Sequence, residues 1–358
     1  MRGDTAESPV RDALALLAVP RIGLREWHRR VASMGSVTAA LAQLAPDVRD
    51  CACAHAAETL DRAAALGATV LCATAPGYPE KLFDLTQVED ASLSPAPPVL
   101  FALGDLGRLG QPAVAIVGTR HATATGLRAA ERIARECSAA GALVISGLAR
   151  GIDAAAHTGA LDAAGGTAAV IGTGLDLAYP ADHRALQRRI AIDGLLLSEQ
   201  PPGSRATRGS FPERNRLIAA LADVTVVVEA GHRSGALLTA AAAQTLGRTC
   251  AAVPGAFDAA ATLGSNALLR DGAQVIASTD DVLTLLRLAR ADDPRATPPP
   301  RLSDAERAIW DVLGTAPLDL DLVVQRAGWA ADACLAAVTT LELKGLVRAT
   351  HDGALLRA

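Results

Sequence analysis

Aromatic residues, lysine and long apolar runs are all scarce in this chain of 358 residues. Aromatic side chains make up 3% of the sequence, and the only lysines are Lys81 and Lys344, so arginine carries nearly all the positive charge. No apolar run approaches the roughly 20 residues that span a bilayer, which argues against a membrane protein. The first residues lack the basic stretch and apolar core of a secretion signal, and we therefore expect a cytoplasmic protein.

Cysteines and net positive charge are also limited. Of the six cysteines, only Cys51 and Cys53 are close together, and neither a second pair nor histidines at ligand spacing accompany them. This arrangement predicts reduced thiols and no metal site. The net charge is −4 at pH 7, so any binding of nucleic acid must depend on a local basic patch and not on the field of the whole protein.

Motifs for nucleotide cofactors are missing or incomplete. The sequence contains no Gly-x-x-x-x-Gly-Lys-Ser/Thr segment, so a nucleotide-driven motor is not indicated. Gly172 and Gly174 follow an apolar run, but the third glycine and the spaced acidic residue of a dinucleotide site are lacking. We therefore expect no bound cofactor.

A strand-then-helix pattern recurs between residues 113 and 281, and nearly every strand ends in a glycine-rich or charged turn. The expected strands lie at residues 113–117, 143–146, 168–171, 195–198 and 224–228. In an open parallel sheet the carboxyl ends of the strands face one crevice, so these turns converge there. Glycine lets a ligand approach the backbone, and helix N-termini present unpaired N–H groups to anions. The sequence predicts an α/β domain with a phosphate-binding crevice.

The chain is expected to divide into an N-terminal helical domain at residues 1–72, a sheet domain at 73–290 and a proline-rich linker at 291–300. A short strand at residues 99–103 leads into the sheet. In the helical domain, the turn at residues 20–23 is similar to a helix-hairpin-helix turn. Such a turn either holds a DNA phosphate through its amides or serves only for packing.

Residues 301–358 are expected to form a separate C-terminal domain. Ser303 and Glu306 form a capping box that opens a helix, and two more helices and a β-hairpin follow. Three helices and a hairpin are typical of a winged helix, which binds DNA or protein. The expected wing holds few basic residues, so protein contact is at least as well supported.

Residues 205–216 form the most informative segment, because they gather arginine around a rare aromatic residue. The segment contains Arg205, Arg208, Phe211, Arg214, Asn215 and Arg216. A base of single-stranded nucleic acid gains about 1–3 kcal/mol by stacking on such a ring while arginines hold the backbone. In the alternative, the arginines form salt bridges with Glu199, Glu213 and Glu229, and Phe211 is tucked beneath the loop. The spacing alone leaves both interpretations open.

Candidate catalytic groups are few. Ser146, Asp153 and His157 could form a hydrolytic triad, but no Gly-x-Ser-x-Gly elbow accompanies them. Asp153 and His157 are four residues apart, so the aspartate is expected to cap a helix and the histidine to pack beside it. Glu199 and Glu229 end strands in the crevice, where a carboxylate ties down loop amides or arginines more readily than it acts alone as a catalyst.

An ordered series of motifs resembles the DNA-processing protein A (DprA/Smf) family of bacterial transformation proteins. The motifs are VGTR at 117–120, SGLARGIDAAAH at 146–157, YP at 179–180, SE at 198–199, FPERNR at 211–216, SGALLT at 234–239, VPG at 253–255 and GSN at 264–266. The resemblance covers roughly residues 78–283 and is weaker at both ends. It implies an extended Rossmann-like domain, with helices on both faces of a mostly parallel sheet. It also implies an N-terminal domain similar to a sterile α-motif or helix-hairpin-helix domain, and a C-terminal winged helix.

The resemblance further implies a function. The family binds single-stranded DNA without base specificity, forms dimers, and delivers the recombinase RecA onto incoming DNA while displacing single-strand-binding protein. The chain is therefore expected to be a recombination mediator in natural transformation and not an enzyme. Two departures from the family pattern stand in the site: Thr119 replaces the usual serine, and Arg208 replaces the lysine of some members, which alters phosphate geometry.

The resemblance and the residue pattern together give two sets of site residues. The expected DNA-binding set is Gly118, Thr119, Arg120, Ser146, Gly147, Arg150, Gly151, Ile152, Arg208, Phe211, Arg214, Asn215, Arg216, Ser234 and Gly235. The expected structural set is Asp153, His157, Gly172, Gly174, Glu199, Glu229, Thr239 and Asn266. Within the first set, we expect Arg120, Arg208, Arg214 and Arg216 to neutralise phosphates, Phe211 to stack a base, and the backbone near residues 146–152 and 234–235 to donate N–H groups.

Two alternatives remain. A phosphoribohydrolase of a related Rossmann-like family would hold one nucleotide in the same crevice and use Glu229 or Glu199 as its catalytic carboxylate. Those enzymes typically carry a Pro-Gly-Gly-x-Gly-Thr turn followed by glutamate, whereas residues 231–236 here read GHRSGA. A pure adaptor with a vestigial crevice is the other alternative, against which the retained glycine and arginine turns argue.

Overall fold

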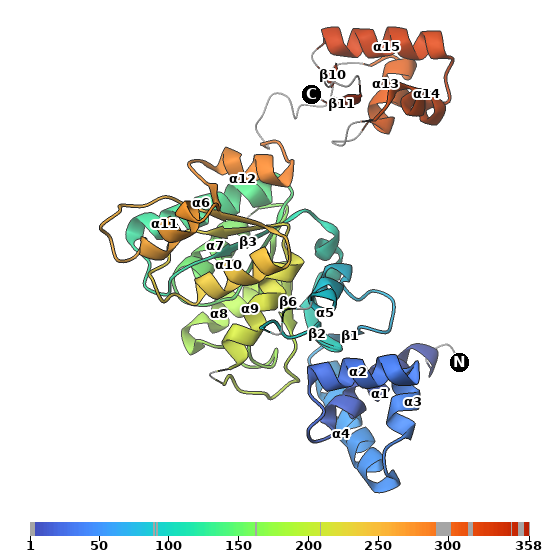
Figure 1. Cartoon of the computed structure of the whole chain (residues 1–358), viewed down its shortest axis with the longest axis vertical. Coiled ribbons are helices and arrows are strands. Elements are labelled where there is room, and N and C mark those ends of the chain that lie inside the picture. Colours follow the sequence, from blue (N-terminus) through green and yellow to red (C-terminus); the bar gives the residue numbers. More distant parts are fainter. Residues whose placement is uncertain are drawn as a thin grey trace. The chain divides into compact units, whose positions relative to one another are not determined.

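The computed structural model describes most of the chain. The described residues are 4–88, 90, 92–161, 163–207, 209–290, 302–313, 318–344, 346–349 and 354–357. They form two compact units, Met1–Leu288 and Ala289–Ala358 (Figure 1). The predicted linker at 291–300 lies outside the described residues.

Four helices begin the first unit, in the region for which the sequence predicts a helical domain. They are α1 (Asp4–Ala18), α2 (Leu24–Met34), α3 (Val37–Ala42) and α4 (Pro46–Ala65). Trp27 of α2 is buried between them and donates its indole N–H to the carbonyl of Ala13 at 3.3 Å. Ile22, in the turn between α1 and α2, is also buried, so this turn packs against the core.

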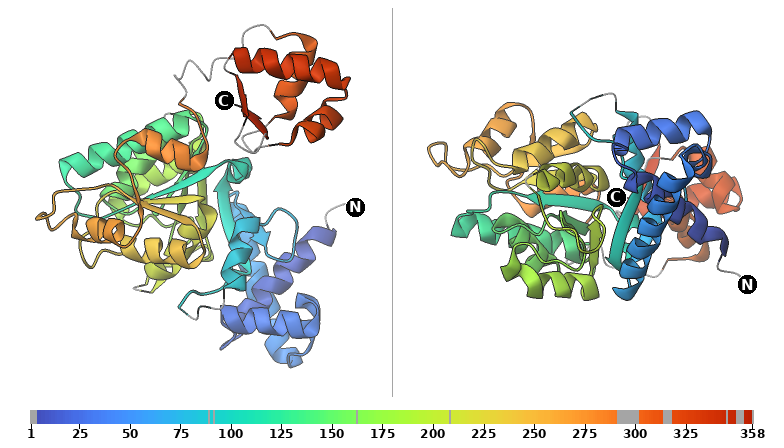
Figure 2. Two further views of the ribbon diagram at one scale, coloured as in Figure 1. Left: turned by 45° about the horizontal axis from the view of Figure 1, so that its top comes forward. Right: turned by 90° about the horizontal axis from the view of Figure 1, so that it is seen from below.

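The sheet begins earlier than the expected domain boundary at residue 72. Strand β1 (Thr69–Cys72) pairs antiparallel with β2 (Val99–Gly104) at one edge of the sheet. Its apolar residues Leu71 and Cys72 are buried, and Cys72 shares an apolar cluster with α1 and α4. The helical domain and the sheet therefore share a core, which explains why they form one unit (Figure 2).

One nine-stranded sheet organises the first unit, in the order β1-β2-β6-β5-β4-β3-β7-β8-β9. The further strands are β3 (Ala113–Val117), β4 (Leu143–Ser146), β5 (Thr167–Val170), β6 (Leu195–Ser198), β7 (Val224–Val227), β8 (Thr249–Ala252) and β9 (Gln274–Val275). From β6 to β9 all neighbours are parallel, whereas β1 and β2 are antiparallel. The chain passes from β3 to β4 on one side and later returns to β7 on the other, so the topological switch point lies beside β3.

Helices cover both faces of this sheet, as predicted (Figure 2). They are α6 (Ala124–Ala139), α7 (Ile152–Leu161), α8 (Arg184–Asp193), α9 (Ser210–Leu221), α10 (Ala236–Thr245), α11 (Leu263–Arg270) and α12 (Thr279–Leu286). Short helices η1 (Glu80–Phe83), α5 (Asp84–Gln87), η2 (Leu106–Gly110) and η3 (Ala181–His183) lie in the connections. Alternate residues of β3 face the two sides: Val114 and Ile116 pack with α6, α7 and α12, and Ala115 packs with α9 and α10. Burial on both faces explains why the strands are apolar throughout.

The second unit has the three helices and the hairpin that the sequence predicts. They are α13 (Asp304–Val312), α14 (Leu320–Ala327), α15 (Ala331–Leu343), β10 (Val347–Ala349) and β11 (Leu355–Arg357). The capping box of Ser303 and Glu306 is present at the start of α13. One side of α15 contributes Cys334, Val338 and Leu341 to the core of the unit, and its other side is exposed.

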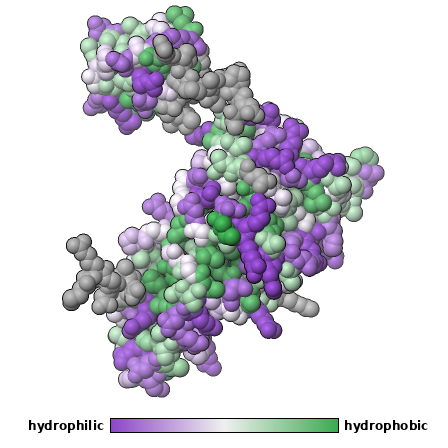
Figure 3. All heavy atoms as spheres, turned by 180° about the vertical axis from the view of Figure 1, so that it is seen from behind, coloured by the Kyte–Doolittle hydropathy of each residue, from purple (hydrophilic) through white to green (hydrophobic). Residues whose placement is uncertain are grey.

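Hydrophilic side chains form bands between smaller apolar areas on the face of the molecule that Figure 3 shows. Within the described part of the chain, no helix combines the length and the apolar composition that crossing a membrane requires.

Candidate nucleic-acid interface

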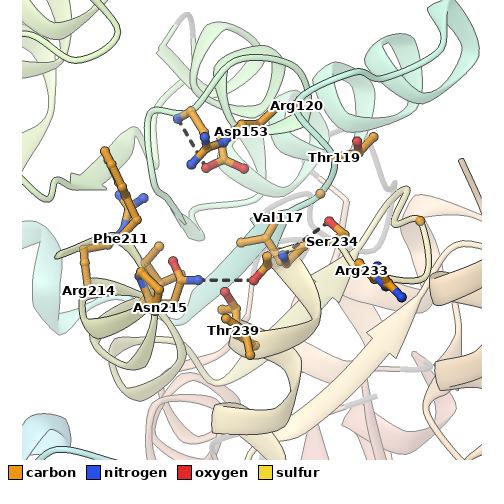
Figure 4. Close-up of a pocket in the computed structure, with 18 of the residues that line it drawn as sticks. Val117, Thr119, Arg120, Asp153, Phe211, Arg214, Asn215, Arg233, Ser234 and Thr239 are labelled. Carbon is orange, nitrogen blue, oxygen red and sulfur yellow. Dashed lines mark hydrogen bonds between the residues drawn. The ribbon is translucent and has the colours of Figure 1, made fainter. Parts of the chain in front are cut away.

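A cavity of about 770 Å³ lies at the switch point, where the turns after β3, β4, β5 and β7 meet. The residues that line it include Val117, Gly118, Thr119, Arg120, His121, Ala149, Asp153, Tyr179, Thr207, Phe211, Arg214, Asn215, Arg233, Ser234, Gly235 and Thr239 (Figure 4). The structure thus brings together residues from five of the predicted motifs. Position at the carboxyl ends of parallel strands is typical of ligand sites in this class of fold.

An arginine and two aromatic rings lie side by side in this cavity. The Cζ atom of Arg120 is 5.4 Å from the centroid of the Phe211 ring, which is the geometry of a cation–π contact. The ring of Tyr179 lies 5.0 Å from that of Phe211, centroid to centroid, with the planes tilted by 39°. Phe211 is partly exposed and Tyr179 is 49% exposed. The rings are therefore available to a ligand that enters the cavity.

Asp153 and His157 hold the loop that follows β4. The carboxylate of Asp153 accepts the N–H groups of Gly147 and Ala149, at 3.2 and 3.3 Å. His157 accepts the N–H of Leu148 at Nε2 and is hydrogen bonded to Thr167 at Nδ1. Both side chains are buried, as expected for the scaffolding role that the sequence predicts.

The hydrogen bonds of His157 require a neutral imidazole. The hydroxyl of Thr167 donates to the carbonyl of Val144, so Nδ1 of His157 must be the donor and Nε2 the acceptor. Burial, together with the nearby charge of Arg214 and the neighbouring His183, lowers the pKa of His157 to about 3. The ring therefore stays neutral in the physiological range, and the loop keeps one geometry.

Arg214 braces the same loop from α9. Its Nη1 donates to the carbonyl oxygens of Gly147 (2.6 Å) and Val170, and the side chain is only 4% exposed. Burial lowers the pKa of Arg214 to about 10, opposed by the charge of Asp153, so the guanidinium remains cationic near neutral pH. Burial likewise raises the pKa of Asp153, opposed by the charge of Arg214. Arg214 thus adds positive charge beneath the cavity and supports the loop through Nη1, while its expected contact with a phosphate stays a prediction.

Arg216 is also a structural residue and does not line the cavity. It is 2% exposed and pairs with Glu199, whose Oε2 lies 2.8 Å from its Nη2. The same guanidinium donates to the carbonyl oxygens of Ser94 and Pro95. The salt-bridge alternative therefore holds for this arginine. Arg214 and Arg216 are two positions apart on α9, and such positions face different sides of a helix.

Several predicted backbone and hydroxyl contacts are already used within the protein. Ser146 is buried and donates its hydroxyl to the carbonyl of Ile116 at 2.6 Å. Ile152 is buried, and its N–H is bonded to the carbonyl of Thr119. With the amide of Gly147 bonded to Asp153, most of the loop donates inward. The expectation that this loop offers its amides and the Ser146 hydroxyl to phosphate is corrected accordingly.

Glu229 and Thr119 connect the turn after β3 to β7. The two carboxylate oxygens of Glu229 accept the N–H and the hydroxyl of Thr123, at 2.9 and 2.5 Å. The N–H of Thr119 is bonded to the carbonyl of Glu229 at 2.7 Å. A side chain at Gly118 would collide with Ile152 and with the Glu229 carbonyl, so glycine is required there. Glu229 therefore ties down loops, as predicted.

The start of α10 contributes one backbone donor to the cavity, the amide of Gly235. Gly235 is the N-cap of the helix, no described side chain caps it, and its own amide has no hydrogen-bond partner among the described residues. Asn215 donates to the carbonyl of Gly235 at 3.2 Å, which holds α9 and α10 together, and Thr239 is buried behind them. A free amide at a helix N-terminus favours an anion.

The remaining predicted residues lie outside the cavity lining or outside the described ranges. Arg150 forms an exposed ion pair with Asp182 at 2.5 Å. Gly172 lies beneath Ser210 and Phe211, and the amide of Gly174 is bonded to the carbonyl of Ser204. Asn266 clamps Gly255 through two hydrogen bonds. Arg208 lies outside the described residues.

The lining residues to which sequence reasoning gave no role include His121, Tyr179 and Arg233. His121 and Arg233 are exposed charged or titratable residues in turns that were already expected to face the crevice. Tyr179 belongs to one of the family motifs, but it was assigned no contact. The sequence could have indicated a role for Tyr179, because it is one of only two tyrosines in the chain and follows the same strand as the Gly172 turn.

Comparisons with known proteins agree with this architecture. The family model for DNA recombination-mediator protein A matches residues 69–287, and that for the DprA winged helix domain matches residues 293–353. A putative DNA processing protein DprA of Mycobacterium tuberculosis is 43% identical over 266 residues, which cover 72% of this chain and 68% of the relative. Protein Smf of Synechocystis is 37% identical over 309 residues, 76% of each protein.

Two solved structures are also similar. DNA processing protein A from Streptococcus pneumoniae superposes with a TM-score of 0.62 at 33% identity, covering 76% of this chain and 95% of that one. The Helicobacter pylori protein, described with its single-stranded DNA binding mode, gives 0.53 at 32% identity and covers 62% and 95%. Since the first family model covers more than half of the sequence and the relatives match along most of their length, this chain belongs to the DNA-processing protein A (DprA/Smf) family of recombination mediators.

Proposed function

We propose that the cavity at the switch point binds single-stranded DNA without base specificity. The observation that carries this proposal is the group formed by Arg120, Phe211 and Tyr179. The Arg120 guanidinium forms no ion pair with another described residue, and it lies against a ring that a base can reach. The single-stranded DNA binding mode of the Helicobacter pylori relative supports the same ligand.

The chemistry of the group favours an unpaired strand. Arg120, Arg233 and the free amide of Gly235 supply positive charge and N–H donors for phosphates. Phe211 and Tyr179 supply flat surfaces on which bases stack, and such stacking requires bases that are not paired in a duplex. Every base has such a face, so binding is independent of sequence. Arg208, which lies outside the described residues, is included in this proposal on the resemblance alone.

The mutational test uses Phe211→Ala and Arg120→Ala, with Arg132→Ala as the matched control. Arg132 is an exposed arginine of α6 that pairs with Glu136, so its replacement removes one positive charge away from the cavity. We expect each cavity variant to weaken binding of oligo-dT by about 5- to 150-fold, the equivalent of roughly 1–3 kcal/mol, with the fold intact. Gel shifts against matched duplex measure this. Wild-type affinity in both cavity variants at moderate salt would remove the assignment.

We further propose that the protein is a mediator that acts in the cytoplasm during natural transformation. It protects incoming single strands, displaces single-strand-binding protein and loads RecA, and a homodimer holds two strand segments at once. Two measurements test these steps. Addition of the protein to strands coated with single-strand-binding protein is expected to restore RecA filament formation, and sedimentation is expected to give twice the mass of the chain. A monomer that does not accelerate RecA assembly would contradict this part.

A binding role without catalysis is also part of the proposal, and the carboxylates support it. Glu229 is engaged by Thr123, Glu199 by Arg216, and Asp153 by two loop amides. A phosphoribohydrolase would need one of them free to act on a bound nucleotide. Incubation with nucleoside monophosphates is expected to release no free base. Release of base that is lost in a Glu229→Gln variant would favour the hydrolase.

A further inference from the structure

A second cavity, of about 390 Å³, lies between α8 and the loop that follows β5. Leu103 and Leu196 form its apolar floor, and Ala178, Arg184, Gln187 and Arg188 are among the residues that line it. None of these residues belongs to the site described above. The cavity therefore has no role in the function proposed so far.

The two cavities are lined by residues that are neighbours in the chain. Ala178 lines the second cavity, and the next residue, Tyr179, lines the first with a ring that is half exposed. Consecutive Cα atoms are about 3.8 Å apart, so the nucleotides next to a base stacked on Tyr179 are within reach of Ala178 and the second cavity.

Two arginines of α8 face this path without partners. Arg184 and Arg188 are four positions apart and so lie on one side of the helix, with Cβ atoms about 5–6 Å apart. Both side chains are exposed, and neither forms an ion pair or a hydrogen bond with another residue in the described ranges. Asp176 also lines the cavity, but its carboxylate accepts the N–H of Gly203 at 2.8 Å. This bond leaves the carboxylate charged, but two arginines against one aspartate give the lining a net positive charge.

Gln187, between the two arginines, offers a hydrogen-bond acceptor. Its Nε2 donates to the carbonyl of Leu175 at 3.0 Å, while its buried Oε1 has no partner among the described residues. An unpaired buried acceptor costs about 1–3 kcal/mol. Each nucleobase carries at least one N–H donor, so a base edge in the cavity removes this cost whatever the sequence.

We propose that the second cavity binds the nucleotides of a single strand that flank those held in the first cavity, with Arg184 and Arg188 on their phosphates. The inference depends on the proposed function, because it requires the strand to pass Tyr179. It extends the binding surface from the switch point over α8, so longer strands gain contacts that short ones lack.

The test measures affinity against strand length and salt in the full chain. An oligo-dT of about six nucleotides is short enough for the first cavity alone, and one of about 30 nucleotides covers both. In Arg184→Ala/Arg188→Ala we expect wild-type affinity for the short strand and weaker binding of the long one. The slope of log K against log salt for the long strand is expected to become less steep by about 1.4, or about 0.7 per lost phosphate contact.

Two control pairs sharpen the result. Arg132→Ala/Arg135→Ala removes two exposed charges from α6, where each arginine pairs with a glutamate, and is expected to retain the wild-type slope. Arg184→Lys/Arg188→Lys keeps both charges and is expected to retain it too. An unchanged slope and affinity for the long strand in the alanine pair would overturn this inference. Wild-type binding of both strands by Phe211→Ala would instead overturn the proposed function, so the two failures are distinguishable.

Discussion

Two surfaces of the molecule are open to solvent but differ in charge: the crevice of the first unit and the exposed side of α15 in the second unit. The crevice gathers Arg120 and Arg233 with the free amide of Gly235. Helix α15 contains no arginine or lysine, and its charged residues are Asp332 and Glu342. Its exposed apolar residues include Leu335 and Leu343, which is 85% exposed.

This difference indicates which unit meets nucleic acid. Affinity for DNA comes mainly from cations placed at phosphates, so a helix with only carboxylates is repelled by the backbone. An exposed surface of leucines flanked by carboxylates suits a protein partner instead. We therefore expect strand binding in the first unit, and the predictions below test that expectation from the largest effect to the smallest.

Removal of Arg214 should destabilise the crevice, because this residue supports the loop that follows β4. Arg214→Ala leaves the buried carbonyl oxygens of Gly147 and Val170 without their donor, at a cost of about 1–3 kcal/mol each. We expect a fall of several kcal/mol in the free energy of unfolding, measured in urea, and weaker binding of single strands. Arg132→Ala, which loses one exposed ion pair, should cost about 1 kcal/mol or less. Equal stability of the two variants would contradict the bracing role.

The expectation that the first unit binds strands can also be tested at Tyr179, which supplies the second aromatic ring of the crevice. Tyr179→Ala is expected to lower the affinity for oligo-dT by about 5- to 150-fold, since one stacked base loses its platform. Tyr179→Phe should retain wild-type affinity, as the flat surface remains. Fluorescence anisotropy with labelled strands measures both. If the phenylalanine variant binds as poorly as the alanine variant, the hydroxyl and not the ring is responsible.

Acid should weaken the first unit through His157. In the unfolded state the imidazole binds a proton near its ordinary pKa of 6.5, but the buried ring does so only near 3, so the stability of the fold falls as pH drops between these values. The slope approaches about 1.4 kcal/mol per pH unit.

The raised pKa of Asp153 acts in the opposite direction, so the prediction concerns a difference between two proteins. His157→Gln removes the titrating ring. Relative to this variant, the wild type is expected to lose stability when urea unfolding is repeated from about pH 7 down to about pH 5. A constant difference across this range would show that the imidazole does not titrate as proposed.

The smallest effect is expected at α15. Leu335→Ala and Thr339→Ala change an exposed side that we do not expect to touch DNA, so affinity for single strands should stay within about twofold. Thr339→Lys/Thr340→Lys adds two cations to the same side and should create measurable binding to duplex. A loss of affinity for single strands in the alanine variants would contradict the expectation that the first unit, and not α15, binds DNA.

Much of the architecture followed from local sequence patterns. The apolar runs with glycine turns predicted the parallel strands and their common crevice, and the Ser303 and Glu306 spacing predicted the capping box. The boundary at residue 72 was less predictable, because β1 is a strand only through its pairing with β2 and its burial against α1 and α4.

The roles of the arginines could not be derived from spacing. Residues 205–216 suggested a group of phosphate ligands, but Arg214 and Arg216 are bonded to carbonyls 67 and 122 residues away in sequence. Only the packing of α9 against the sheet determines which guanidiniums are buried. The roles of Arg120 and Phe211 in binding DNA remain predictions, although the contact between them was not foreseen and supports both.

The loop after β4 depends on contributions from distant parts of the chain. Asp153 and His157 come from α7, Thr167 from β5, and Arg214 from α9. A truncated fragment that ends before α9 would keep the loop sequence but lose one of its supports. If this loop contributes to strand binding as proposed, we expect that no binding module can be cut from the protein at the motif level, and that a nascent chain cannot bind DNA here until α9 has been synthesised.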